Sequence, residues 1–311
     1  MITFAELRDK WEKMPVFSNA FLLIDGSHHI DINIGYEKVN QKTLLIRNSG
    51  SVESLPSSTS ISVSNYQLED GTWVLSFRLI QVENEEVFLR FCWDIIESSR
   101  EIQQNVIDFI LERYSKWLRL LQYKHPEIMS VSRQKGLIGE LLFLENLSLS
   151  AGKLKALDSW CGPQGADQDF IYDNTWAEVK TVTISSTTVS ISSLEQLDTN
   201  TDGIIILYKL DKTTDADVKG FSLNNVVNDV RGLFQGDTKM EELLDLRLFQ
   251  YGYKDRPEYD KQKYRLKGTD VYKVNAEFPR LTKRNVPNEI TSAKYFLDLA
   301  AISLFKEGSN G

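Results

Sequence analysis

Three charged residues, Asp169, Glu178 and Lys180, are spaced as they would be across a short β-hairpin. They lie in two runs rich in β-branched and aromatic residues, and the pair Asp173-Asn174 between the runs tolerates the positive φ angles of a tight turn. A two-residue loop at this pair places Asp169 directly opposite Glu178. Side chains alternate along a strand, so Lys180 shares the face of Glu178. The pattern predicts two carboxylates and an amine on one surface.

This arrangement predicts a site for positive charge. Two carboxylates that face each other across a hairpin destabilise it, unless a cation lies between them. Lys180 supplies one charge, and Mg²⁺ is suited to supply more, because it binds one or two carboxylates together with waters and phosphate oxygens. Asp167 lies opposite Lys180 and competes for the metal, but we favour Asp169 because it pairs with Glu178. The alternative is a surface hairpin that carries a Glu-Lys pair.

A third carboxylate, Glu140, lies upstream in a helical pattern. Apolar residues recur at positions 137, 141 and 144, and Glu140 falls at the edge of this apolar face. Carboxylates are rarely buried without a partner, so Glu140 is a candidate for the same site. The alternative is a glutamate that caps the helix or extends from its surface.

Together these residues resemble the PD-(D/E)XK nuclease superfamily, which has a restriction-endonuclease-like fold. The matching series is Glu140 on a helix, Asp169 at the head of a strand, Glu178-Val179-Lys180 on the next strand, and Gln196 near the start of a helix. An uncharacterised bacterial subfamily is similar in particular, through Gly139-Glu140-Leu141, Trp160-Cys161-Gly162-Pro163, Asp169-Phe170 and Glu178-Val179-Lys180-Thr181. One departure is that Gln168, not proline, precedes Asp169.

The resemblance implies a metal-dependent endonuclease that hydrolyses phosphodiester bonds of DNA. In that reading Asp169, Glu178 and the main-chain carbonyl of Val179 hold Mg²⁺, for which Mn²⁺ can substitute. Glu140 would hold a second ion or orient the waters of the first. The endonuclease activity and the carbonyl ligand from Val179 follow from the superfamily and not from the spacing of the residues.

The resemblance also implies roles for the remaining residues and for the protein. Lys180 would orient the attacking water and offset developing negative charge. Gln196 would be a polar group beside the site, with a capping or surface glutamine as the alternative. A bacterial role in restriction or phage defence is implied, alongside ATPase or methyltransferase partners. Many nucleases cut as homodimers, so a homodimer is a further expectation.

The composition is that of an ordinary globular protein. A chain of 311 residues exceeds one core of usual size and predicts two domains. No apolar run reaches membrane-spanning length, and we find no signal-peptide pattern. The two cysteines, Cys92 and Cys161, provide neither a disulfide framework nor a metal motif. We therefore expect a cytoplasmic protein with no membrane partner.

Charge is unevenly distributed along the chain, whose net charge is −8. Residues 113–135 hold six Lys/Arg and one Asp/Glu, and residues 247–285 hold eleven and five. The segment 136–246 between them holds eight basic and eighteen acidic residues. Carboxylates flanked by basic segments fit a metal-dependent enzyme that acts on a polyanion. The alternative is that the basic segments are ordinary solvated surfaces.

The order of predicted elements indicates an α/β (α+β) protein. We expect an antiparallel β-rich N-terminal module over residues 1–93, a connecting helix over 94–125, and a nuclease-like domain over 126–311 that ends in a basic segment. Within the module, residues 61–93 predict three strands. Residues 94–122 predict one long helix. The nuclease-like domain is expected to have a restriction-endonuclease-like core with a central mixed sheet flanked by helices.

Two other classes of function fit parts of this pattern. The first is a DNA-binding or structural subunit of a multi-protein defence complex, with a weak or partner-dependent nuclease site. The complete set of Asp169, Glu178 and Lys180 speaks against a degraded site. The second is a Mg²⁺-dependent hydrolase of nucleotides, although the basic segments favour a polymer. Salt-sensitive binding of short duplexes would separate a nuclease from a nucleotide hydrolase.

Overall fold

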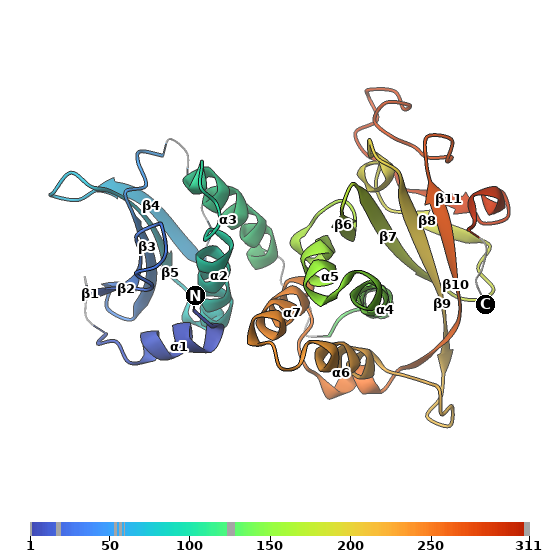
Figure 1. Cartoon of the computed structure of the whole chain (residues 1–311), viewed down its shortest axis with the longest axis horizontal. Helices are drawn as coiled ribbons and strands as arrows, with labels where there is room; N and C mark the ends of the chain where they lie inside the picture. Colours follow the sequence, from blue (N-terminus) through green and yellow to red (C-terminus); the bar gives the residue numbers. More distant parts are fainter. Residues whose placement is uncertain are drawn as a thin grey trace. The chain divides into compact units, whose positions relative to one another are not determined.

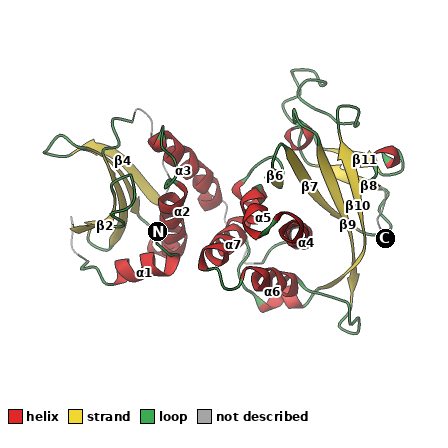
Figure 2. Cartoon of the chain, viewed as in Figure 1, coloured by secondary structure: helices red, strands yellow, loops and turns green. Residues whose placement is uncertain are grey.

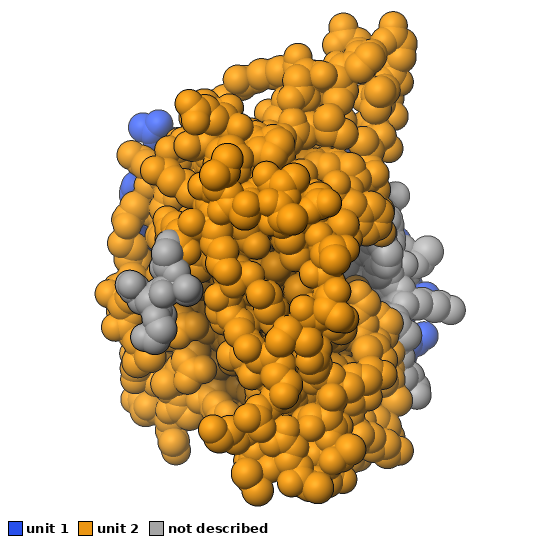
Figure 3. Space-filling model, turned by 90° about the vertical axis from the view of Figure 1, so that its right-hand side faces the viewer, with its two compact units in different colours: residues 1–124 blue, residues 125–311 orange. Residues whose placement is uncertain are grey.

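The computed structural model describes residues 2–16, 20–52, 55, 58, 60–122 and 128–307. The chain divides into two compact units, residues 1–124 and 125–311. Figure 3 shows the surface of the second unit in orange.

The first unit is an antiparallel sheet packed against helices (Figure 1). Its strand order is β1-β2-β3-β5-β4, with bounds β1 (Ala20–Leu23), β2 (Ile32–Lys38), β3 (Gln41–Arg47), β4 (Ile61–Gln67) and β5 (Trp73–Leu79). The helices are α1 (Phe4–Glu12), α2 (Glu85–Ser98) and α3 (Val106–Gln122). Phe77 of β5 contacts both Phe91 of α2 and Tyr114 of α3, with ring centroids 5.2 and 5.1 Å away. These aromatic contacts join the sheet to both helices.

Two expectations for this unit are wrong. Residues 61–93 form two strands and not three, because their last part begins α2. The apolar residues of that part recur at helical spacing. The helix places Phe91 on its inner face, where the side chain is fully buried. Residues 94–122 are not one helix, because α2 ends at Ser98 and α3 begins at Val106. Asn105 has a φ of 52°, a left-handed backbone that a continuous helix does not contain.

The second unit is built on a mixed sheet of order β10-β9-β7-β6, in which β7 and β9 are parallel and the outer strands are antiparallel to their neighbours. The strands are β6 (Phe170–Tyr172), β7 (Thr175–Val182), β9 (Gly203–Thr213) and β10 (Lys263–Val274). The strands β8 (Thr188–Ile191) and β11 (Tyr295–Asp298) form a separate pair. The helices are α4 (Val131–Ala151), α5 (Lys153–Ser159), α6 (Leu223–Phe234) and α7 (Thr238–Tyr251).

Helices cover one face of this sheet, and β8 with β11 covers the other (Figures 1 and 2). Ala177 and Val179 of β7 belong to the core cluster on the helical side, whereas Trp176 belongs to the cluster that contains β8 and β11. Because side chains alternate, Glu178 and Lys180 extend on the side of Trp176. The mixed sheet flanked by helices, after an antiparallel β-rich N-terminal module, confirms the predicted fold class.

Gly139 lets α4 approach β7 closely. A Cβ atom at this position would lie 2.7 Å from Cγ2 of Thr181 and 3.1 Å from Cγ1 of Val179. Both neighbours are β-branched and cannot easily turn away. The glycine is therefore required where the helix that carries Glu140 crosses the strand that carries Glu178.

We expect Gly139→Ala to lower the free energy of unfolding by about 1 kcal/mol or more, because overpacking outweighs the better helix propensity of alanine. Thermal or urea unfolding measures the change. Thr181→Ser removes the clashing methyl group, so the double variant should recover most of the loss. A single variant as stable as the wild type would contradict this close approach.

Candidate active site

The hairpin has the predicted register. Tyr172 pairs with Thr175 and Phe170 with Ala177, and Asp173 in the turn has a φ of 49°. Regular pairing ends at Phe170, the first residue of β6. The position opposite Glu178 is therefore taken by Asp169, just outside the strand.

Asp169 is held from two sides. Its Oδ2 accepts a hydrogen bond of 2.8 Å from the main-chain N–H of Val179. Its carbonyl oxygen accepts from the N–H groups of Cys161 and Gly162, both at 3.0 Å. The side chain of Asp169 thus accepts a hydrogen bond from the N–H of Val179 beyond the point where the strand pairing ends, and this bond fixes it against β7. The competing residue Asp167 is exposed.

Glu178, Lys180 and Gln196 form one hydrogen-bonded network. Glu178 is 1% exposed, and its Oε1 accepts from Nζ of Lys180 at 2.7 Å and from Nε2 of Gln196 at 2.8 Å. The Oε1 of Gln196 accepts from Lys180 at 3.2 Å and from the N–H of Ser192 at 2.7 Å. Gln196 lies in a single 3₁₀ turn, Glu195–Leu197. Oε2 of Glu178 is buried without a hydrogen-bond partner among the described residues.

Glu140 approaches the same carboxylates from α4. It is 6% exposed, so the edge of the apolar face on which it lies is buried. Its Oε2 accepts a hydrogen bond of 2.8 Å from Nε1 of Trp160. A Cβ atom at Gly162 would lie 3.2 Å from this oxygen and 3.0 Å from Oδ1 of Asp169. Both oxygens therefore border one small space beside Gly162.

Tyr251, at the end of α7, is a site residue that the sequence patterns did not indicate. Burial and then the charge of Glu140 raise the pKa of Tyr251 well above its usual value. Its hydroxyl group donates to the carbonyl oxygen of Arg133 at 3.4 Å, and a Cβ at Gly136 would lie 2.8 Å from that hydroxyl. The guanidinium of Arg133 lies 5.2 Å from the centroid of the Tyr251 ring and donates to its carbonyl oxygen. No local sequence pattern connects Tyr251 with Glu140, because the two residues are far apart in the chain. Trp160, by contrast, belongs to the motif Trp160-Cys161-Gly162-Pro163.

A comparison with known protein families identifies the family of this chain. A family model described as "Putative PD-(D/E)XK family member, (DUF4420)" matches residues 6–300. The chain belongs to this PD-(D/E)XK family. No curated protein and no solved structure matches it. The match covers both units of the structure and confirms the resemblance that the motifs indicate.

In this PD-(D/E)XK protein, burial raises the pKa of all three carboxyl groups. Burial, and then the charge of Asp169, raise the pKa of Glu178 to about 8, while Lys180 lowers it. Burial and Asp169 also raise the pKa of Glu140 well above its usual value. The pKa of Asp169 is raised by burial, against the hydrogen bond from Val179 and the charge of Lys180. The charged form of each group is therefore disfavoured in the folded protein until a cation binds.

These shifts predict that the metal-free protein loses stability as the pH rises. Each carboxyl group has a higher pKa in the folded state than in the unfolded state, so its contribution to stability is full below the unfolded pKa, 4.5 for the glutamates and 3.8 for Asp169. The contribution is lost as the pH rises through the folded pKa, which is about 8 for Glu178. Melting temperatures in EDTA between pH 5 and 9 measure this. Glu140→Gln still accepts from Trp160 but does not titrate, so its melting temperature should fall less steeply. Equal slopes would contradict the raised pKa of Glu140.

The basic segments of the PD-(D/E)XK protein are partly neutralised by ion pairs. In the segment 247–285, Nη1 of Arg265 lies 2.6 Å from Asp217, and Nζ of Lys283 lies 2.9 Å from Glu195. Part of the segment 113–135 lies outside the described residues. Counting charges along the sequence therefore overstates the positive charge that the second segment presents.

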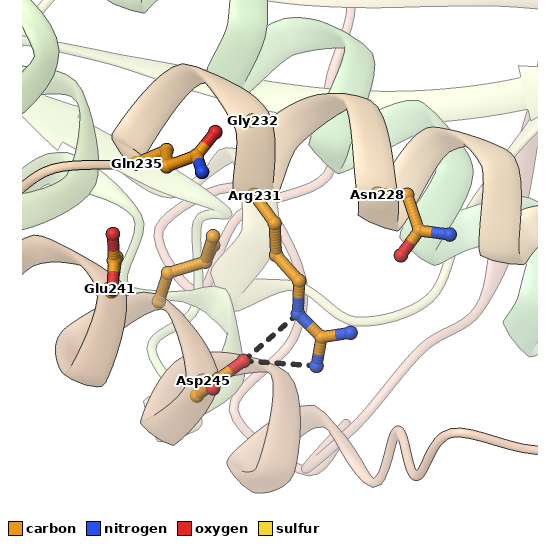
Figure 4. Close-up of a pocket in the computed structure, with 7 residues that line it drawn as sticks. Asn228, Arg231, Gly232, Gln235, Glu241 and Asp245 are labelled. Carbon is orange, nitrogen blue, oxygen red and sulfur yellow. Dashed lines mark hydrogen bonds and ion pairs between the residues drawn. The ribbon is translucent and has the colours of Figure 1, made fainter.

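A separate pocket lies between α6 and α7 (Figure 4). Its volume is about 390 Å³, and its lining is Asn228, Arg231, Gly232, Gln235, Glu241, Leu244 and Asp245. Arg231 in this pocket pairs with Asp245 at 3.0 Å. None of the predicted site residues lines it, so the pocket is distinct from the carboxylate site.

Proposed function

We propose that this PD-(D/E)XK protein is a metal-dependent endonuclease that hydrolyses phosphodiester bonds of DNA. One observation carries the proposal: Glu140, Asp169 and Glu178 converge from a helix, a loop and a strand, and Lys180 lies 2.7 Å from Glu178. Buried carboxylates that raise one another's pKa are costly in a protein that needs them only for folding. They are expected where a cation is bound.

The residues fit a hard divalent cation such as Mg²⁺, with Mn²⁺ as a substitute. Among the described residues, Oε2 of Glu178 is buried without a hydrogen-bond partner, which suits an oxygen that binds an ion. Among the residues that the structure describes, no three His, Cys, Asp or Glu side chains are grouped so as to hold a metal ion. The proposed first site therefore uses two carboxylates, Asp169 and Glu178, and the carbonyl of Val179. Mg²⁺ accepts such a set because it keeps several waters.

The proposed reaction assigns a role to each polar side chain. A divalent ion would supply Lewis acidity toward the phosphate and a more acidic bound water. Lys180, tethered to Glu178, donates to the attacking water or to a phosphate oxygen and offsets the charge that develops there. Gln196 holds Lys180 and Glu178 together through its two amide atoms. Glu140 orients waters at the first site or contributes to a second ion.

The biological setting is part of the same proposal and is supported by the resemblance to nucleases. A role in bacterial restriction or phage defence, in the cytoplasm, would place ATPase or methyltransferase proteins among its partners. Within the described residues, no helix is both long enough and apolar enough to span a membrane. A homodimer would allow both strands of a duplex to be cut.

Cleavage of plasmid and oligonucleotide DNA tests the proposal. We expect cutting with Mg²⁺ or Mn²⁺ and none in EDTA. Duplex binding measured at two salt concentrations should weaken with salt, because neutralised phosphates release counterions. Salt-independent binding together with hydrolysis of free nucleotides would support a nucleotide hydrolase instead. Salt-sensitive duplex binding without cleavage would support the DNA-binding subunit.

A further inference from the structure

Gln168 occupies the position before Asp169, where the superfamily name has proline. Its side chain is 8% exposed, and its Nε2 donates to two successive carbonyl oxygens, those of Glu195 at 3.0 Å and Gln196 at 3.2 Å. The buried amide of Gln168 thus connects two segments: the chain that leads into the hairpin, and the 3₁₀ turn that carries Gln196. Proline has no side-chain donor and could not make either bond.

The turn that Gln168 holds is the one that organises Lys180 and Glu178. Gln196 donates to Glu178 at 2.8 Å, and its Oε1 lies 3.2 Å from Nζ of Lys180. A small displacement of the turn would move both atoms of the Gln196 amide away from these partners. Lys180 would then keep only its bond to Glu178 within this network. The position of the Gln196 amide therefore depends on the contacts that hold this turn in place.

Leu197 of the turn is fully buried in the core cluster that contains β8 and β11, but its apolar contacts do not aim the amide of Gln196. The other polar supports of the turn are closer to solvent than Gln168. The loop around residue 280 contacts it through Arg280, which donates to the carbonyl of Leu197 at 2.9 Å, and through Lys283, which pairs with Glu195 at 2.9 Å. The side chain of Lys283 is 63% exposed, and pairs of this kind contribute little. Gln168 is the buried polar support, and its loss would leave two carbonyl oxygens without this donor.

We propose that Gln168 is a positioning residue for the proposed nuclease reaction, acting through the turn of Gln196. The proposal rests on the proposed function for its catalytic consequence, but its structural part can be measured without any activity. Gln168 touches neither the proposed metal ligands nor Lys180 through its amide. The contacts of its side chain therefore lead to Gln196.

The first test follows the amide proton of Ser192, which donates to Oε1 of Gln196 at 2.7 Å and so reports where that side chain lies. We expect Gln168→Met to speed hydrogen exchange at Ser192 about tenfold or more in NMR spectra of the full chain. The matched control is Gln262→Met, which removes a similar bond, from Nε2 to the carbonyl of Lys263 at 2.9 Å. Wild-type exchange at Ser192 in Gln168→Met would overturn the proposal, whether or not the protein is a nuclease.

The second test is a double-mutant cycle on DNA cleavage. We expect Gln168→Met to lower kcat about 10- to 100-fold with little change in KM, because positioning residues around a metal site have effects of this size. If Gln168 acts through Gln196, the double variant with Gln196→Ala cuts as slowly as Gln196→Ala alone. Multiplied effects in the double variant would show a general structural role and overturn the proposal. No cleavage by the wild type would count against the proposed function, and the exchange measurement would still decide on Gln168.

Discussion

Lys180→Ala is expected to lower kcat/KM for DNA cleavage about 100- to 1,000-fold or more, the usual cost of removing a donor to developing charge. The reason is the position of Nζ, which Oε1 of Glu178 and Oε1 of Gln196 hold at 2.7 and 3.2 Å. Alanine leaves both acceptors in place but removes the positively charged ammonium group of Lys180. Cleavage of a labelled duplex under single-turnover conditions measures the chemical step directly.

The same substitution should leave the fold intact. Without Lys180, Glu178 is a buried carboxyl beside Asp169, but its pKa is already raised to about 8, so it takes up a proton instead of remaining charged. The control is Lys155→Ala, which removes a lysine that pairs with Asp173 at 2.7 Å in an exposed part of the same hairpin. We expect Lys155→Ala to cut like the wild type. Inactivity of both variants, or a collapse of the melting temperature in Lys180→Ala, would assign Lys180 a structural role.

Asp169→Asn is expected to change stability in opposite directions with and without metal. Asparagine still accepts from the N–H of Val179 but carries no charge, so repulsion with Glu178 and Glu140 is relieved and the metal-free variant should melt above the wild type. Mn²⁺ affinity should fall roughly 100-fold or more. Loss of a residue that only hydrogen-bonds to a metal ligand typically lowers metal affinity about 10- to 100-fold, and loss of the ligand itself should cost more. Manganese at about 100 times Kd should raise the melting temperature of the wild type by roughly 5–10 °C and leave the variant almost unchanged.

Calorimetric titration of Mn²⁺ and melting curves in EDTA supply both measurements. Asp173→Asn is the matched control, because it removes an exposed carboxylate from the turn of the same hairpin, where asparagine tolerates the positive φ. It should bind Mn²⁺ like the wild type. An Asp169→Asn variant that is less stable without metal, or that binds Mn²⁺ normally, would contradict the role assigned to Asp169.

Elements whose patterns are local were predictable. The register of the hairpin follows from Asp173-Asn174 and the two runs beside it, since pairing across a tight turn needs no distant contact. Residues 85–93 were misassigned because the run Phe88–Trp93, apolar except for Arg90, is short enough to fit either a strand or a helix, and packing against the sheet decides.

Local sequence was therefore sufficient to bring Asp169, Glu178 and Lys180 onto one hairpin, because strand alternation and turn chemistry act between neighbours. It could not show that Tyr251 reaches Glu140 or that Gln168 holds the turn of Gln196. Those contacts join segments far apart in the chain. They form only when α4, α7 and the hairpin pack around a common core, and no periodicity or spacing in the sequence encodes such a packing.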